Sequence, residues 1–400
     1  MNVPKMRFRD FNNEYISKKL SDISELTSSK RIYLSDYVND GIPFYRGKEI
    51  TELKANKDVS DLLYITKEKY NEIKTKYGVP EKNDILITGV GTLGNIYRVT
   101  NENPFYFKDG NLIWLKNIKE NSKYIEYNLE KNKRKILDSA IGSTQKALTI
   151  VGLSKLEFSF PSLNEQTKVS NFLSLLDKKI ELQSKKIEDL KLFKKGLSND
   201  LIDCINEYNE FTLEDIGTTY SGLSGKAKED FENGNSKFIS FMSVLKDKIE
   251  VDKLPTVKID SNENQNKVQK NDLFFNTSSE TKEEVALCST INEDIDNLYL
   301  NSFCFGYRIN NLKLVNNEYL NIMLHCTSYR KLISNLGQGF TRVNISKKEL
   351  MNLIVKVPSI DVQTKIVDII NKVKNIIDLE VIKLSKLLEF KKGLMQQLFI

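Results

Sequence analysis

The feature that most constrains this sequence is a repeat with a period of half the chain. Segments 161–200 and 358–397 align without a gap at an offset of 197 residues, and 14 of their 40 positions are identical. Both segments open with Pro-Ser, and both carry "FKKGL" towards their end. Such a period is too long for a solenoid, whose repeats are short. We therefore predict a tandem duplication in which a variable block is followed by the repeated segment, twice.

The repeated segment has the periodicity of a long coiled-coil helix. In each copy, eight of ten residues in two seams with seven-residue spacing are apolar, which indicates a single packing stripe. A helix of about 40 residues, roughly 60 Å long, with one such stripe needs a partner. The other copy is the obvious partner, so we predict an antiparallel pair. The seam positions are Val169, Leu176, Gln183, Leu190, Leu197, Leu173, Ile180, Ile187, Lys194, Leu201 and Ile366, Val373, Glu380, Leu387, Leu394, Ile370, Ile377, Leu384, Lys391, Leu398.

The start of the first helix carries a capping signature. Ser162 can cap the helix, and Glu165 stands three residues later, which is the pattern of a capping box. The second copy keeps the serine but has Val362 at the matching position, so it keeps the cap and loses the box.

Each predicted helix also contains one glycine near its end, Gly196 and Gly393. Glycine in a helix interior costs about 1 kcal/mol relative to alanine. The glycine is explained equally well by a frayed or kinked last turn and by the close approach of a neighbouring helix.

The two variable blocks have the pattern of mixed α/β domains. Each alternates short β-branched and aromatic runs with glycine-containing turns, adds one or two helical segments, and ends in a strand before the proline of the repeat. The expected division is 1–160, 161–203, 204–357 and 358–400. Strands are predicted within 84–100, 105–116 and 299–310, and helices within 123–140 and 317–336.

The residues needed for common catalytic and metal sites are scarce. The single histidine, His325, excludes a multi-histidine metal site. The cysteines show no CxxC spacing, which argues against a thiolate zinc site and a disulfide framework and favours free thiols in a reducing cytoplasm. They are Cys204, Cys288, Cys304 and Cys326.

One acidic cluster leaves an enzymatic alternative open. Asp272, Glu280 and Lys282 could form the metal site of a nuclease. The matching position in the first half is Asp84, without such companions, and an acid that opens a strand after Lys-Asn is more simply a turn residue. The chain is therefore predicted to be a recognition or scaffold protein.

Overall composition permits, but does not require, a polyanionic partner. The chain has 60 basic and 54 acidic residues and a net charge of +6, so the clustering of charge matters more than its sum. We found no run of 18 apolar residues that would suggest a membrane span, and no signal peptide at the start.

The ordered set of motifs resembles the specificity subunit of type I restriction–modification systems. The motifs are "PKMRFRDFNNEYISKKLSDI" near the start, "P-S-x-x-x-Q-T-K" at both helix starts, and "FKKGLMQQLF" at the end. The resemblance covers essentially the whole chain. It implies an α/β fold with two target recognition domains, 1–160 and 204–357, joined by two long antiparallel spacer helices, 161–203 and 358–400.

The resemblance also implies a function. Each recognition domain would read one half of a bipartite sequence in double-stranded DNA. Two methyltransferase subunits and the restriction (motor) subunits would be the partners, in the cytoplasm and without a membrane. The chain would be non-catalytic and hold no cofactor, because the partner subunits would bind S-adenosylmethionine, ATP and Mg²⁺. The alternative of another class is a coiled-coil scaffold that displays two protein-binding domains.

Candidate DNA-contacting residues lie in polar, glycine-rich loops. Arg, Lys, Asn and Gln can read base edges, whereas Ser, Thr and Lys also bind phosphates. Thr144 and Thr341 stand at the same 197-residue offset, which makes this pair the best supported. The candidates in the first block are Tyr45, Arg46, Lys48, Thr88, Thr92, Asn95, Ser143, Thr144, Gln145 and Lys146. Those in the second block are Ser221, Ser224, Lys226, Lys228, Asn276, Thr277, Ser278, Ser279, Gln338, Thr341, Arg342 and Asn344.

Overall fold

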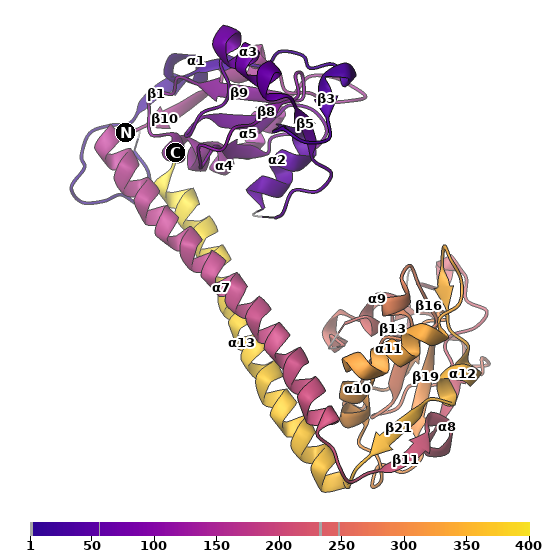
Figure 1. Cartoon of the computed structure of the whole chain (residues 1–400). Coiled ribbons are helices and arrows are strands. Elements are labelled where there is room, and N and C mark those ends of the chain that lie inside the picture. Colours follow the sequence, from indigo (N-terminus) through magenta and orange to yellow (C-terminus); the bar gives the residue numbers. More distant parts are fainter. Residues whose placement is uncertain (1–2, 56, 232–233, 247–248) are drawn as a thin grey trace. The chain divides into compact units, whose positions relative to one another are not determined.

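The computed structural model describes residues 3–55, 57–231, 234–246 and 249–400 (Figure 1). The chain divides into two compact units. Unit 1 is Met1–Gln183 together with Lys383–Ile400, and unit 2 is Ser184–Ile382. Each unit therefore contains one variable block and a part of both long helices, so neither half of the sequence forms a unit alone.

Unit 1 is built on two four-stranded sheets with the orders β2-β9-β6-β7 and β3-β5-β4-β8. A separate antiparallel pair, β1 with β10, leads into the long helix. Strands β6 and β9 are buried along almost their whole length, which suits their run of Ile, Leu and Trp residues. The strands are β1 Ile16–Lys19, β2 Glu25–Thr27, β3 Tyr37–Val38, β4 Ile42–Tyr45, β5 Leu63–Ile65, β6 Ile85–Thr88, β7 Ile96–Arg98, β8 Tyr106–Phe107, β9 Leu112–Lys116 and β10 Glu157–Phe160. The helices are α1 Leu20–Ile23, α2 Gly47–Lys54, α3 Lys67–Tyr77, α4 Ser122–Lys131, α5 Lys133–Asp138 and α6 Ile150–Ser154.

Unit 2 repeats this plan with different outer elements. Its sheets have the orders β12-β19-β15-β17 and β14-β13-β18, and two further antiparallel pairs are β16 with β20 and β11 with β21. The strands are β11 Asn209–Thr212, β12 Gly217–Ser221, β13 Ser236–Ile239, β14 Thr256–Val257, β15 Leu273–Asn276, β16 Ser278–Ser279, β17 Cys288–Thr290, β18 Leu298–Leu300, β19 Cys304–Ile309, β20 Val343–Asn344 and β21 Ile354–Val357. The helices are α8 Leu213–Ile216, α9 Phe241–Val244, α10 Asn317–His325, α11 Thr327–Leu336 and α12 Lys347–Met351. The predicted mixed α/β class is confirmed, and each predicted helical segment is divided into two helices.

The two long helices, α7 (Leu163–Asp203) and α13 (Ile360–Leu398), are confirmed. In unit 1, Leu173 of α7 shares a core with Leu394 and Leu398 of α13. In unit 2, Ile202 of α7 shares a core with Ile370 of α13. The seam is therefore buried within each unit, as the heptad pattern predicts.

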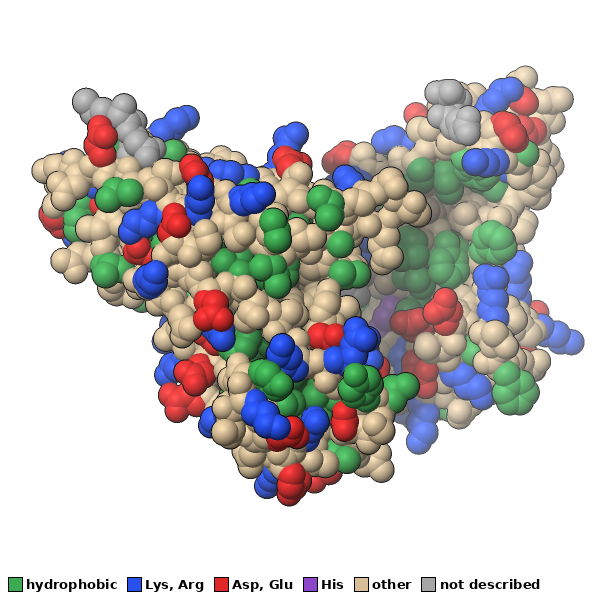
Figure 2. Space-filling model, turned by 90° about the horizontal axis from the view of Figure 1, so that it is seen from above, with side chains coloured by type: hydrophobic (Ala, Val, Ile, Leu, Met, Phe, Trp, Pro, Cys, Tyr) green, Lys and Arg blue, Asp and Glu red, His purple; other side chains and the backbone are tan. Residues whose placement is uncertain are grey.

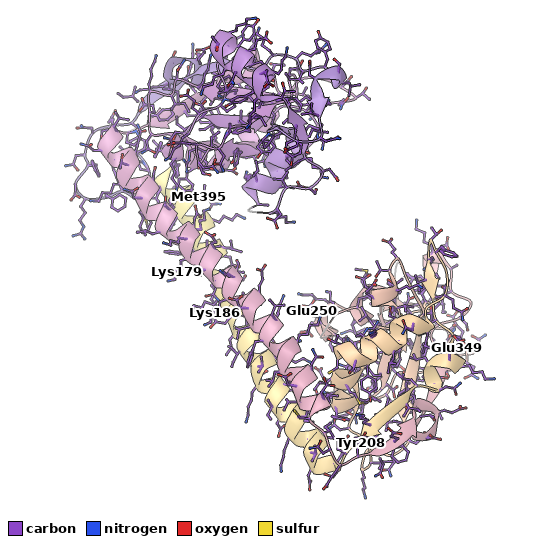
Figure 3. The ribbon with its side chains drawn as sticks, in the orientation of Figure 1. Lys179, Lys186, Tyr208, Glu250, Glu349 and Met395 are labelled. Carbon is purple, nitrogen blue, oxygen red and sulfur yellow. The ribbon has the colours of Figure 1, made fainter. Side chains whose placement is uncertain are left out.

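Two ion pairs show in which direction the two long helices run relative to each other. Lys391 lies 2.5 Å from Asp177 in unit 1, and Lys186 lies 2.5 Å from Glu380 in unit 2. As the residue number rises along α7 it falls along α13, so the helices run antiparallel. Figure 3 shows Lys186 on α7.

A buried glutamine at the start of each long helix explains the repeated "Q" of the motif. Gln166 accepts a hydrogen bond from the backbone N–H of Asn121 (3.0 Å) and donates to the carbonyl of Pro161 (2.9 Å). Gln363 accepts from the N–H of Asn316 (2.8 Å) and donates to the carbonyl of Pro358 (2.9 Å). Both side chains are fully buried. Each glutamine thus ties its long helix to the start of α4 or α10.

The prediction of a capping box at the start of α7 is only half confirmed. Ser162 Oγ accepts a hydrogen bond from the N–H of Glu165 at 3.4 Å, as expected for the cap. Instead, the Glu165 carboxylate accepts hydrogen bonds from Nε and Nη2 of Arg7, each at 2.7 Å, and from the Tyr15 hydroxyl. The N-terminal arm thereby anchors to the helix start through a buried ion pair.

The helix glycines are explained neither by fraying nor by the close approach of another helix of the described chain. Helix α7 continues past Gly196 to Asp203, and α13 continues past Gly393 to Leu398, so neither glycine lies in a frayed turn. Apart from the local helix backbone and chain neighbours, nothing lies within 4 Å of where a Cβ would stand at either position. No neighbouring helix of the described chain therefore comes close enough to require a glycine at either position.

The glutamine ties give a stability prediction. Replacing Gln166 or Gln363 with Ala leaves a buried backbone N–H and a buried carbonyl without their side-chain partner, which costs about 2 kcal/mol. We expect Gln166→Ala and Gln363→Ala each to lower the urea midpoint of unfolding, followed by circular dichroism. Gln396→Ala, at an exposed position of α13, is the matched control and should leave the midpoint unchanged. Equal midpoints for all three variants would contradict the assignment.

Candidate nucleic-acid interface

Two matching loops stand out as the candidate interface. Segment 141–147 in unit 1 is closed by two backbone hydrogen bonds between Ile141 and Ala147, both 2.9 Å. Segment 338–344 in unit 2 is closed in the same way between Gln338 and Asn344, at 2.9 and 2.8 Å. The two loops lie at the 197-residue offset of the repeat. The shared offset of Thr144 and Thr341 therefore reflects one shared loop structure.

The glycine in each loop is required by the backbone. Gly142 and Gly339 have φ values of +111° and +114°, in a region that other residues rarely adopt. A Cβ at these positions would stand 2.4 Å from the carbonyl oxygen of Gln145 and 2.3 Å from that of Arg342. The loops can close only around a glycine.

The loop tips point side chains into solvent. Ser143, Thr144, Gln145 and Lys146 are all exposed in unit 1. In unit 2, Phe340, Thr341 and Arg342 are exposed, whereas Val343 is buried and anchors the loop. A rigid loop with exposed amide, guanidinium and hydroxyl groups can present fixed donors and acceptors to base edges.

Each loop is bonded to the same place on its sheet. In unit 1, Leu148 N–H donates to the carbonyl of Gly89 (2.9 Å), and Gly89 N–H donates to the carbonyl of Asn111 (2.7 Å). In unit 2, Ile345 N–H donates to the carbonyl of Thr277, and Thr277 N–H donates to that of Phe303, both at 3.1 Å. The loop therefore sits beside the end of the central strand, β6 or β15, and the turn before β9 or β19.

Unit 2 brings two of the predicted segments together. Strands β16 and β20 pair Ser278 with Asn344 and Ser279 with Val343. Arg342 Nε donates to Ser278 Oγ at 3.1 Å, and its guanidinium lies 5.9 Å from the Phe303 ring centre. This bond uses one edge of the guanidinium and holds the group in place, so its remaining N–H groups can be presented to a ligand.

Several predicted residues have internal partners instead. Thr88 and Asn95 are buried, and Asn95 donates to Thr51 Oγ1 at 2.8 Å. Asn276 is buried, and its amide donates to the carbonyls of Ser278 and Glu284, both at 3.0 Å. We expect these side chains to shape the loops rather than to contact DNA.

The segment around α2 holds three further candidates. Tyr45 is half-buried, with its ring 5.0 Å from that of Phe105. Arg46 is paired with Glu49, and Lys48 lies 2.9 Å from Asp61. Burial opposes ionisation of Glu49, but the hydrogen bonds from Arg46 and the backbone keep its pKa below the usual value. These cations are therefore already neutralised by acidic neighbours.

Segment 221–228 is likewise tied down within unit 2. Only 7% of the Lys226 side chain is exposed, and its ammonium lies 2.5 Å from Glu263. Hydrogen bonds from Lys226 and Gln265 lower the pKa of Glu263 to about 2. Ser224 N–H donates to Gln265 at 3.1 Å, and Ser221 accepts from Asn266. Lys228 is exposed.

The remaining candidates lie on loop surfaces. Thr92 is exposed in the turn between β6 and β7, and its carbonyl accepts a hydrogen bond from the Thr88 hydroxyl. Thr277 Oγ1 donates to the carbonyl of Phe303, and Ser279 Oγ donates to Glu284. Gln338 is exposed and contacts Glu349 through hydrogen bonds of 3.3 and 3.4 Å. DNA contact by the exposed candidates remains a prediction.

The nuclease alternative does not fit the geometry of Asp272. This carboxylate is fully buried and bonded to Arg308 Nε (2.9 Å) and Nη2 (2.7 Å) and to the Tyr220 hydroxyl (2.7 Å). It also accepts from the N–H of Gln269, as Asp84 does from Glu81 in unit 1. Its interpretation as a turn residue is thus confirmed. Among the described residues, no group of three or more His, Cys, Asp or Glu side chains could hold a metal ion.

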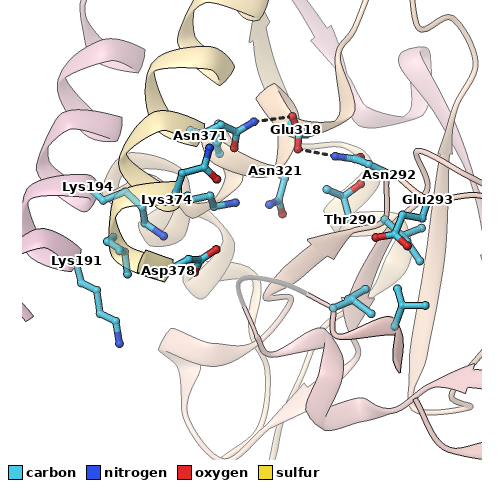
Figure 4. Close-up of a pocket in the computed structure, with 16 residues that line it drawn as sticks. Lys191, Lys194, Thr290, Asn292, Glu293, Glu318, Asn321, Asn371, Lys374 and Asp378 are labelled. Carbon is cyan, nitrogen blue, oxygen red and sulfur yellow. Dashed lines mark hydrogen bonds between the residues drawn. The ribbon is translucent and has the colours of Figure 1, made fainter. Parts of the chain in front are cut away.

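Unit 2 also has a cavity of about 290 Å³ beside the long helices, with a mixed polar and apolar lining (Figure 4). At its wall, Glu318 accepts hydrogen bonds from Asn292 (2.5 Å) and Asn371 (3.0 Å). Lys374 also lines the cavity, and the matching position in unit 1 is Asp177, which is bonded to Tyr127. None of the predicted DNA-contacting residues lines it, so the cavity is separate from the candidate interface.

Charge does not mark the interface by itself. On the face shown in Figure 2, basic and acidic side chains are interspersed in both units. That face therefore offers no large basic surface to a polyanion, and a specific contact there would depend on individual side chains. Within the described part of the chain, no helix combines the length and apolar character needed to cross a membrane.

Comparison with known proteins agrees with this architecture. The family described as "Type I restriction modification DNA specificity domain" matches residues 12–192 and again 205–389. The chain belongs to this family and carries its domain twice.

A curated relative from Haemophilus influenzae, a putative type I restriction enzyme specificity subunit, is 33% identical over 177 residues. The match covers 44% of this chain and 42% of that protein, so it spans less than half of the relative's length.

Two solved structures share the fold over nearly the whole chain. A type I restriction–modification S subunit from M. genitalium aligns with a TM-score of 0.55 and 17% identity, covering 100% of this chain and 99% of that one. The second is a chain from a structure titled as the structural basis of complex assembly and conformational transition of the type I R-M system. It aligns with a TM-score of 0.60 and 14% identity, covering 95% of this chain and 96% of that one.

Sequence reasoning missed one exposed residue of the interface, Phe340. Its side chain is 107% exposed at the loop tip. Apolar residues are usually assigned to the core, and for that reason it was not a candidate. The signal that could have identified it was its position in the loop, which matches Ser143 at the 197-residue offset of the repeat.

The geometry predicts separate effects for the two loops. Arg342→Ala removes the guanidinium held by Ser278 and should weaken binding of a specific duplex by about 1–3 kcal/mol, with relaxed base preference at one position. Gln145→Ala should relax preference in the other half of the target only. Binding can be measured by fluorescence anisotropy, with circular dichroism as the control for folding. An equal loss on unrelated DNA would contradict a base-reading role for Arg342.

Proposed function

We propose that this chain is the DNA-reading subunit of a type I restriction–modification complex, with one unit for each half of a bipartite target. The observation that carries the proposal is the pair of glycine-closed loops at the same place in both units. They share backbone hydrogen bonds and position but differ in their exposed side chains. A duplicated scaffold with different tips is suited to two different half-sites.

The loop chemistry suggests how each half is read. The amide of Gln145 can form a bidentate pair with adenine, and the guanidinium of Arg342 can do so with guanine, in the major groove. Thr144 and Thr341 can bind phosphates or base edges. Exposed Lys146 and Lys228 can neutralise phosphates, which contributes affinity without sequence preference.

The proposed partners are those that membership of the family suggests. Two methyltransferase subunits would dock on the long helices and would methylate an adenine in each half-site after flipping it out of the duplex. Restriction subunits would join that complex. In this proposal the chain is non-catalytic and cytoplasmic, and S-adenosylmethionine, ATP and Mg²⁺ are bound by the partners.

The direct test is a base-resolution map of methylated adenines in the source genome, with and without the gene. We expect one split motif, two short halves with a fixed gap, to lose methylation when the gene is deleted. Restoring the gene should restore the motif. An unchanged methylation pattern, together with DNA binding that does not distinguish sequences, would contradict the proposal and favour a protein scaffold.

A further inference from the structure

The two loop tips differ most at one position. At residue 340 unit 2 presents a phenylalanine whose side chain is fully exposed, whereas unit 1 presents Ser143. A phenyl ring in water is unfavourable, because its apolar surface is removed from water only on contact with another apolar group. Single exposed apolar residues are common, so exposure alone assigns no role.

The surroundings of Phe340 supply the second observation. The ring stands on a loop that turns at Gly339, where φ is positive, and is closed by the hydrogen bonds between Gln338 and Asn344. Two residues later, Arg342 is held by Ser278 with its remaining N–H groups available for presentation. One hydrogen-bonded loop thus carries an exposed phenyl ring two residues from a guanidinium that is held by a hydrogen bond.

We propose that Phe340 packs against the C5-methyl group of a thymine next to the guanine that Arg342 bonds. This inference rests on the proposed function, since it requires that the loop enters the major groove. The thymine methyl is the apolar group that base edges display there, and contact with it by an apolar side chain is a known means of base discrimination. Ser143 has no comparable apolar surface, so no phenyl contact with a thymine methyl is available at the matching position of unit 1.

The proposal makes a prediction that other roles of Phe340 do not. Deoxyuridine pairs as thymidine does but lacks the methyl group. Replacing the thymines in the unit 2 half-site with deoxyuridine should weaken binding about fourfold, which corresponds to the loss of one buried methyl contact. The same replacement in the unit 1 half-site should have a smaller effect, because Ser143 offers no phenyl surface at the matching position.

The test uses the full chain in complex with its methyltransferase partners and fluorescent duplexes of the mapped target. The half-site of unit 2 is identified as the one whose base preference changes in Arg342→Ala. Phe340→Ser, which introduces the residue type found at position 143, should bind the thymine duplex about fourfold more weakly and show no further loss with deoxyuridine. Met242→Ser is the matched control, because Met242 is another exposed apolar side chain of unit 2, and it should behave as the unaltered chain.

The outcomes separate this inference from the function on which it rests. Specific binding that is insensitive to deoxyuridine overturns the methyl contact and leaves the proposed function intact. A Phe340→Ser variant that remains sensitive to deoxyuridine also overturns the methyl contact and leaves the proposed function intact. The same holds for a Phe340→Ser variant that binds DNA normally but loses its methyltransferase partners, because that result would make Phe340 a protein contact. Absence of any specific binding overturns both.

Discussion

The apolar seam shared by α7 and α13 is the constraint on which the rest of the structure depends. Each helix has one apolar stripe, and a stripe of that length can be buried only against a matching one. Because the helices run antiparallel, the end of α13 completes unit 1 and the end of α7 completes unit 2. Each unit is therefore finished by residues from the other half of the sequence.

The buried glutamines connect this seam to the recognition units. Gln166 and Gln363 bond backbone groups at the starts of α4 and α10, next to the long helices. Fully buried amides with several partners are sensitive to small displacements, because an unmatched polar group is costly in the interior. They hold the α/β part of each unit against the start of the long helix that follows it in the sequence. The variable loops can then differ freely, since the attachment does not depend on them.

Much of the architecture could be predicted from the sequence. The heptad pattern predicted the long helices, short β-branched and aromatic runs between glycine-containing turns predicted strands, and the shared offset of Thr144 and Thr341 located the paired loops. What failed depends on contacts distant in sequence. The Glu165 carboxylate binds Arg7, 158 residues away, and no local pattern shows this.

The candidate site was predicted less well for the same reason. Polarity selects loops, but it does not separate the exposed Thr341 from the buried Asn276, whose amide bonds the backbone. Lys226 is hidden by its pair with Glu263. Phe340 was overlooked because its exposure depends on the glycine-closed loop and not on its own residue type. In the proposed function, those loops determine which bases are read, and the two long helices would act as the spacer that the family resemblance implies.

The sharpest measurement of the proposed spacing role is the gap of the target after both helices are lengthened. One heptad, inserted at matching positions of α7 and α13, keeps the seam in register and adds about 10 Å of helix. We expect methylation of the same two half-sites with the gap enlarged by about three base pairs, at roughly 3.4 Å per pair. Methylation at the original gap would contradict the claim that the helix pair sets the spacing.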